Sequence, residues 1–236
     1  MAKVKIPKSK KKNFSSFSVS EAYKQLGIIT LIPWEFESQP LPISDFFKKR
    51  LERLHKHFDL RSYEESKKLL IDAFCEEAME NLDQLKIWKG GRLESDVLIG
   101  NADYLIAQKK DYLEVPFLCI IEAKKDDFEQ GLAQCLVEMQ ACQWQNKQAG
   151  KPIDILGIVT NAREWMFYKL DLSGKVYESR GYISDDAAQT LGALHHIFQE
   201  CEKNLSKNQF ILSSLESLAT AIPFVGAALR VLEQLF

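Results

Sequence analysis

Three charged residues lie at the ends of two apolar segments that the sequence pattern predicts to be paired strands. Asp103 precedes the apolar run 104–107, and Glu122 and Lys124 close the run that begins at Pro116. Side chains alternate along a strand, so Glu122 and Lys124 project to the same face. In an antiparallel pair the start of the first strand lies beside the end of the second. We therefore expect Asp103 to lie close to Glu122 and Lys124.

Two carboxylates held close together repel each other, and burial of either charge alone is costly. A divalent cation between them removes the repulsion, and hard oxygen ligands favour Mg²⁺, with Mn²⁺ as a substitute. Such a cation polarises a phosphoryl oxygen or lowers the pKa of a bound water, and Lys124 can orient or activate that water. The alternative is a strand that ends in a solvated charge pair, since a bare Glu-x-Lys motif is common. The complete arrangement, with a helix directly after Lys124, favours metal-dependent phosphodiester hydrolysis.

The arrangement resembles the PD-(D/E)xK superfamily of metal-dependent nucleases. The matching residues are Asp103 and Glu122-Ala123-Lys124, although the Pro that often precedes the first Asp is absent. The segment from Gly157 to Tyr168 is similar to a hairpin in relatives of the N-terminal nuclease domain of type I restriction enzyme R subunits. The resemblance covers roughly residues 63–170. It implies a restriction-endonuclease-like α/β fold, with a mixed central sheet flanked by helices, and a Mg²⁺-dependent nuclease acting on nucleic acid, DNA in preference to RNA.

Two further residues are candidates for the same site. Many members of the superfamily carry a Gln on the helix after the E-x-K motif, and Gln134 matches it; the alternative is a polar core residue satisfied by the backbone. Glu77 lies on the apolar stripe of the helix before the sheet, where a carboxylate needs a partner. It is our candidate for an additional metal ligand, with a surface ion pair as the alternative. Glu64 and Glu65 are explained as favourable charges at a helix N-terminus.

Asp96 is the rival of Asp103 for the first acidic position. We favour Asp103 because it lies at the start of the more apolar run.

Composition describes an ordinary globular chain with an unequal distribution of charge. The chain has 236 residues, of which 46% are hydrophobic, and a net charge of −2. Six lysines within the first twelve residues contribute +6, which leaves about −8 for the remainder. An acidic body counts against tight nucleic-acid binding, although a local basic surface can coexist with it. The five cysteines form no C-x-x-C pair, and buried free thiols in a reducing cytoplasm are the expected state.

The hydrophobic periodicity predicts about five strands, four helices and a helical C-terminal tail. The predicted strands are 93–99, 103–107, 116–124, 153–160 and 165–170, and the predicted helices are 44–58, 62–85, 128–147 and 185–204. We divide the chain into a disordered basic arm (1–16), an N-terminal helical and irregular decoration (17–60), the nuclease-like core (61–184) and C-terminal helices (185–236). Within the last region, 210–236 is predicted to form two short helices broken at Pro223, which could pack on the core or form a homo-oligomer contact. No segment resembles a signal peptide or a membrane span, so we expect a cytoplasmic protein.

Two other functions compete with the enzyme. The first is a catalytically silent nuclease-like module that binds nucleic acid or supports assembly. The second is a toxin, anti-phage or regulatory protein whose C-terminal helices bind a partner. Neither requires Lys124, so an intact set of Asp103, Glu122 and Lys124 favours the nuclease.

Overall fold

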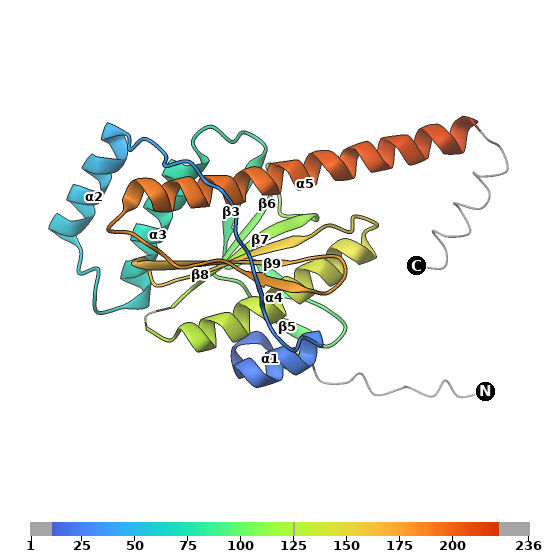
Figure 1. The fold of residues 1–236 in the computed structure, drawn as a ribbon, viewed down its shortest axis with the longest axis horizontal. Coiled ribbons are helices and arrows are strands. Elements are labelled where there is room, and N and C mark those ends of the chain that lie inside the picture. Colours follow the sequence, from blue (N-terminus) through green and yellow to red (C-terminus); the bar gives the residue numbers. More distant parts are fainter. Residues whose placement is uncertain (1–10, 125, 222–236) are drawn as a thin grey trace.

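A mixed central sheet organises the molecule (Figure 1). The structure is a computed structural model that describes residues 11–124 and 126–221, with side chains described up to residue 207. Its main sheet has eight strands in the order β2-β10-β9-β8-β7-β6-β3, with β11 paired to β9. The bounds of these strands are β2 Ile32–Pro33, β3 Leu85–Lys89, β6 Tyr104–Gln108, β7 Phe117–Ala123, β8 Ile155–Thr160, β9 Glu164–Leu170, β10 Val176–Glu178 and β11 Tyr182–Ile183.

The centre of the sheet is the pair β7 and β8, which is parallel, whereas β6 and β9 flank it in antiparallel register. Every residue of both central strands is buried. Near-continuous apolar sequence is typical of strands covered on both faces. The predicted mixed α/β architecture is confirmed, and the sheet has more strands than the five expected.

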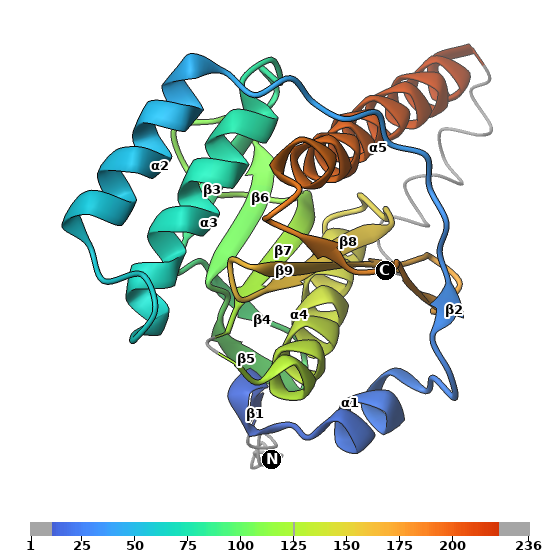
Figure 2. The same ribbon diagram turned by 60° about the vertical axis from the view of Figure 1, so that its left-hand side comes forward.

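Helices cover both faces of the sheet (Figures 1 and 2). Helices α4 and α1 lie on one face, and α2, α3 and α5 lie on the other. Their bounds are α1 Val19–Leu26, α2 Asp45–His57, α3 Glu64–Met79, α4 Phe128–Gln148 and α5 Ala187–Ala221. None of the helices within the described ranges combines the length and the apolar character needed to cross a bilayer.

The helix predicted over 62–85 is too long at its C-terminal end. Helix α3 ends at Met79, and β3 begins at Leu85 as the edge strand beside β6. Leu82 and Leu85 fit the helical stripe by spacing alone, which is why the prediction continued through them. The alternation of Leu85 and Ile87 with lysines is a strand signal that the prediction missed.

The single strand predicted over 93–99 is two strands of a separate small sheet. Strands β4 (Arg92–Glu94) and β5 (Leu98–Asn101) form a hairpin, and β1 (Lys12–Asn13) pairs with β5. The buried Ser95 hydroxyl accepts a hydrogen bond from the Leu98 N–H at 3.1 Å, which stabilises the turn.

The prediction of a disordered basic arm over residues 1–16 is wrong for the last residues of that range. Residues 12–16 form β1 and a short 3₁₀ helix, and Phe14 is buried. Residues 1–10 lie outside the described part of the chain.

The C-terminal helix is longer than predicted. Helix α5 runs without interruption from Ala187 to Ala221, so the predicted break after residue 204 and the separate helix from 210 are wrong. The break at Pro223 lies outside the described residues.

The chain between α1 and α2 crosses the molecule in an extended path and passes over α5 (Figure 2). The Leu41 N–H donates to the Ala188 carbonyl at 2.9 Å. A Cβ added at Gly192 would overlap the Gln39 carbonyl oxygen. This crossing orders the segment that leads into α2.

We expect Gly192→Ala to destabilise the protein by about 1–3 kcal/mol, the usual cost of forcing an atom into a packed contact. Thermal or urea unfolding measures the change. Gly181→Ala is the control, because its added Cβ would meet the Met166 sulfur at 3.4 Å, an ordinary contact. Equal free energies of unfolding for Gly192→Ala and Gly181→Ala would contradict a close contact between α5 and the segment that joins α1 to α2.

Candidate functional site

Asp103 lies directly before β6 and opposite the end of β7. The register pairs Tyr104 with Ile121, which places Asp103 across from Glu122. Its Oδ2 accepts a hydrogen bond from the Ala123 N–H at 3.0 Å, and its Oδ1 accepts one from Lys68 Nζ at 2.9 Å. The backbone contact fixes the carboxylate in the position that the strand pairing predicted.

Glu122 is a fully buried carboxyl group at the end of the central strand. Burial raises the pKa of Glu122 to about 8, and the neighbouring Asp103 adds to the rise. Lys124 Nζ forms an ion pair with Glu122 Oε1 at 2.6 Å, whereas Glu122 Oε2 has no hydrogen-bond partner among the described residues. A buried carboxyl group with one unpartnered oxygen can accept a ligand.

Lys124 leaves the sheet at the same edge and is held on several sides. Its N–H donates to the Thr160 carbonyl at 2.9 Å, and its Nζ donates to Gln134 Oε1 at 3.3 Å. Burial lowers the pKa of Lys124, but the carboxylates of Glu122, Glu64 and Asp103 together raise it by more, so the pKa stands above its usual value. A Cβ at Gly131 would lie 2.7 Å from Val159 Cγ1 and 2.9 Å from Lys124 Cγ. Glycine there lets α4 approach the lysine stem closely.

Helix α4 contributes two polar residues to this edge. Gln134 and Glu138 are one turn apart, and Gln134 Nε2 donates to Glu138 Oε1 at 3.1 Å. Glu138 is completely buried, and burial raises its pKa well above the usual value, with a further rise from Glu122. A hydrogen-bonded path thus runs from Glu138 through Gln134 to Lys124. Sequence reasoning missed Glu138; the signal available was an acidic residue inside an apolar helix.

Helix α3 brings a second lysine to the site. Lys68 Nζ lies 2.9 Å from Asp103, 2.7 Å from Glu65 and 3.6 Å from Glu64. Burial lowers the pKa of Lys68, but Glu65 and Asp103 raise it by more. Glu64 also acts on the pKa values of Glu122 and Lys124, which places its charge near both. The (i, i+4) spacing places Glu64 and Lys68 on one helix face, but only tertiary packing brings that face to Asp103.

Glu77 does not join this group. Its Oε1 accepts from the Ser44 N–H at 2.8 Å and its Oε2 from the Ser44 hydroxyl at 2.9 Å. Ser44 is also the N-cap of α2, where its hydroxyl accepts from the Phe47 N–H at 3.0 Å. The prediction that Glu77 is a metal ligand is therefore wrong. Both oxygens of its carboxylate accept hydrogen bonds from Ser44 at the start of α2.

The donor set at the sheet edge fits a hard divalent cation. Within the described ranges no three His, Cys, Asp or Glu side chains converge on one point. Asp103 and Glu122 nevertheless face each other across paired strands, and Glu122 Oε2 has no hydrogen-bond partner among the described residues. Two carboxylates plus water satisfy Mg²⁺, which usually keeps several waters. Binding through Asp103 Oδ1 requires Lys68 to move away.

A cleft of about 900 Å³ lies between α2, α3 and the loops that follow β7 and β8. Its lining includes Lys67, the neighbour of Lys68, together with Asp126, Asn161 and Arg163. On its other side it is bounded by the C-terminal part of α2 and the residues that follow. Asp103, Glu122 and Lys124 do not line this cleft.

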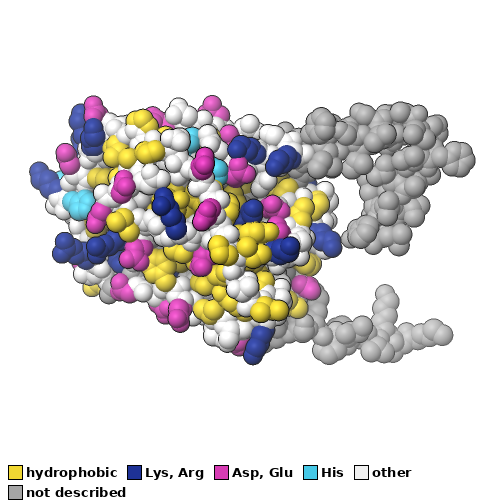
Figure 3. Space-filling model, in the orientation of Figure 1, with side chains coloured by type: hydrophobic (Ala, Val, Ile, Leu, Met, Phe, Trp, Pro, Cys, Tyr) yellow, Lys and Arg dark blue, Asp and Glu magenta, His cyan; other side chains and the backbone are white. Residues whose placement is uncertain are grey.

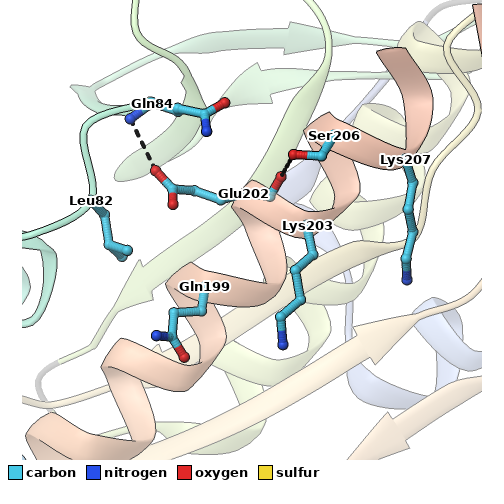
Figure 4. Close-up of a pocket in the computed structure, with 7 residues that line it drawn as sticks. All are labelled: Leu82, Gln84, Gln199, Glu202, Lys203, Ser206 and Lys207. Atoms are coloured by element: carbon cyan, nitrogen blue, oxygen red, sulfur yellow. Dashed lines mark hydrogen bonds between the residues drawn. The ribbon is translucent and has the colours of Figure 1, made fainter. Parts of the chain in front are cut away.

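A different hollow lies between α5 and the start of β3 (Figure 4). There the Gln84 N–H donates to the Glu202 carboxylate at 2.9 Å. None of the site residues described above lines this hollow, so we do not assign it to the same chemistry.

No protein-family model matches this chain, and no curated protein matches it. The class of the protein is therefore argued from the geometry of the site and from the resemblance of its motifs.

We expect the buried carboxyl group to make stability depend on pH. The pKa of Glu122 is about 8 in the folded protein, against an ordinary value of 4.5. Between these values the folded state binds the proton more tightly than the unfolded state, so stability falls as the pH rises from about 5 to about 8. Glu122→Gln removes this contribution and should flatten the decline, as measured by thermal unfolding without divalent cations. Glu94→Gln, on the exposed β4, should keep the wild-type slope; a wild-type slope for Glu122→Gln would contradict the pKa shift.

Proposed function

We propose that this protein is a Mg²⁺-dependent nuclease that hydrolyses phosphodiester bonds of nucleic acid, DNA in preference to RNA. The observation that carries the proposal is the convergence of Asp103, Glu122 and Lys124 where β6 begins and β7 ends in a mixed sheet. We also infer a cytoplasmic location, where the five buried cysteines stay as free thiols.

The metal would be held by Asp103 and Glu122. Mg²⁺, when bound, would neutralise charge on the phosphate and lower the pKa of a coordinated water. Mn²⁺ would substitute for it. Asp103 and Glu122 would hold this cation where β6 begins and β7 ends, in place of the ion pair between Asp103 and Lys68.

Lys124 would act as a cation. Its raised pKa favours the ammonium form at neutral pH, and an ammonium donates hydrogen bonds but accepts none. It can therefore orient the attacking water or stabilise the negative charge that develops on the phosphate oxygens. This supports the orienting role over direct proton removal.

Glu138 would position Lys124 through Gln134. The carboxyl oxygen accepts from the amide Nε2, so the amide Oε1 points the other way, toward the Lys124 ammonium. An apolar residue in the core would be cheaper to bury than Glu138. The presence of Glu138 at this buried position fits a role in fixing which way the Gln134 amide oxygen and nitrogen point.

The competing proposal is a silent nucleic-acid-binding or assembly module. It is favoured by the two lysines, because Lys68 and Lys124 balance Asp103 and Glu122 without any metal ion. A fold stable in that form does not need a cation for its structure. Metal-dependent turnover separates the two proposals.

We expect Asp103→Asn and Lys124→Ala to reduce Mg²⁺- or Mn²⁺-dependent DNA cleavage at least about 100-fold, the usual loss when one group that stabilises the transition state is removed. Cleavage of labelled duplex and single-stranded DNA and of RNA measures it. Asp96→Asn is the matched control, because Asp96 lies exposed in the β4–β5 turn. Cutting by the wild type at no more than the rate of the Asp103 and Lys124 variants on every substrate would exclude the enzyme.

We expect Glu138→Met to lower kcat about tenfold or more, since misplaced catalytic groups cost that much or more, with KM unchanged and thermal stability equal or higher. Glu138→Gln retains an acceptor oxygen for Gln134 and should stay near wild type. Steady-state kinetics and thermal unfolding measure both variants. Met139→Leu on the same buried helix controls for repacking. Similar kcat values for Glu138→Met and the wild type would remove the positioning role.

A further inference from the structure

Helix α2 carries a row of cations on the side that faces away from the core. Lys49, Arg53 and Lys56 are spaced by four and three residues, so they share one helix face. All three are exposed. The apolar residues Phe47, Leu51 and Leu54 have the same spacing, shifted by two positions, which places them on the opposite face. We call Lys49, Arg53 and Lys56 the basic row.

The basic row is a local exception to the charge of the molecule. The chain without its first twelve residues carries about −8, yet α2 has five Lys and Arg residues against two acidic ones. Lys and Arg side chains gather at the left of Figure 3, where Figure 1 places α2. Lys48 and Arg50 pair with Asp45 and Glu76. Among the described residues, the three members of the basic row have no ion pair.

Helix α2 is also one wall of the cleft between α2, α3 and the loops after β7 and β8. Leu51, His55 and Phe58 line the cleft from the α2 side, and Lys67 and Asp126, which are close in sequence to Lys68 and Lys124, line it from the other side. The basic row therefore lies on the outer face of a helix that forms one wall of this cleft. A polyanion bound along that outer face would lie beside the cleft.

We propose that the basic row binds the sugar-phosphate backbone of nucleic acid beside the candidate site. The proposal deepens the proposed function and rests on it only for what the site does to the bound strand. Nucleic acid is favoured over an anionic membrane because an interfacial helix must insert its apolar face. The apolar face of α2 is already buried: Phe47 contacts Phe74 of α3, with ring centroids 5.1 Å apart.

The test compares two variants of equal charge. Lys49→Gln/Arg53→Gln/Lys56→Gln removes the basic row, and Lys24→Gln/Lys109→Gln/Lys175→Gln removes three exposed lysines elsewhere. The probe is a fluorescein-labelled 30-base-pair DNA duplex, measured by anisotropy in EDTA at several salt concentrations from 50 to 200 mM. Each phosphate contact contributes about 0.9 to the slope of log affinity against log salt. We expect the basic-row variant to lose affinity at least about tenfold and its slope to shrink by about 2 to 3, while the control variant changes little.

The outcomes separate this inference from the enzyme proposal. If both variants lose equal affinity, or if the basic-row variant binds like the wild type, the inference is overturned. The inference is also overturned if removal of the basic row weakens binding to phosphatidylglycerol-phosphatidylcholine vesicles and leaves binding to DNA unchanged. Selective loss of DNA binding in the basic-row variant supports the inference. If the wild type also cuts no nucleic acid with Mg²⁺, that second result contradicts the nuclease proposal and leaves this inference intact. Equal melting temperatures of the variants exclude misfolding as the cause.

Discussion

The structure depends on one costly feature, a carboxyl group buried at the end of the central strand. Glu122 has no exposed surface, Asp103 lies across from it, and like charges in that setting repel. Each neighbouring element reduces this cost. Lys68 from α3 balances Asp103, and Lys124 from the end of β7 balances Glu122. Helix α3 is thus connected to the sheet by an ion pair, and α4 by the hydrogen bond between Lys124 and Gln134, in addition to apolar packing.

The same constraint explains two of the buried polar residues of α4. A helix that covers a largely apolar strand pair would ordinarily present only apolar side chains, and Gln134, Glu138 and Asn146 depart from that rule. Asn146 is paired with the backbone of Phe117. Gln134 and Glu138 are connected to Lys124 by hydrogen bonds. Polar groups in a core are tolerated where they are paired, and here the pairing ends at the charged edge of the sheet.

Much of the architecture could be predicted from sequence because its signals are local. The central strands and α4 have long apolar runs, and the antiparallel pairing that brings Asp103 to Glu122 follows from the short polar link between two such runs. The extent of α3 and the start of β3 were harder to predict, because Leu82 and Leu85 continue the helical spacing and the strand alternation begins only at Leu85. The partner of Glu77 was beyond sequence reasoning, since Ser44 lies 33 residues away and only tertiary packing joins them. Lys68 was missed for a related reason: its importance appears only once α3 is placed against the end of β7.

The bond between Glu77 and Ser44 has a consequence for how α2 can move. One carboxylate accepts both donors of the residue that begins α2, so the start of that helix is anchored to α3. Helix α3 also carries Lys68, which contacts Asp103. These contacts connect the N-cap residue of α2, through α3, to Asp103 directly before β6, so a change in the position of one of these three elements is transmitted to the other two.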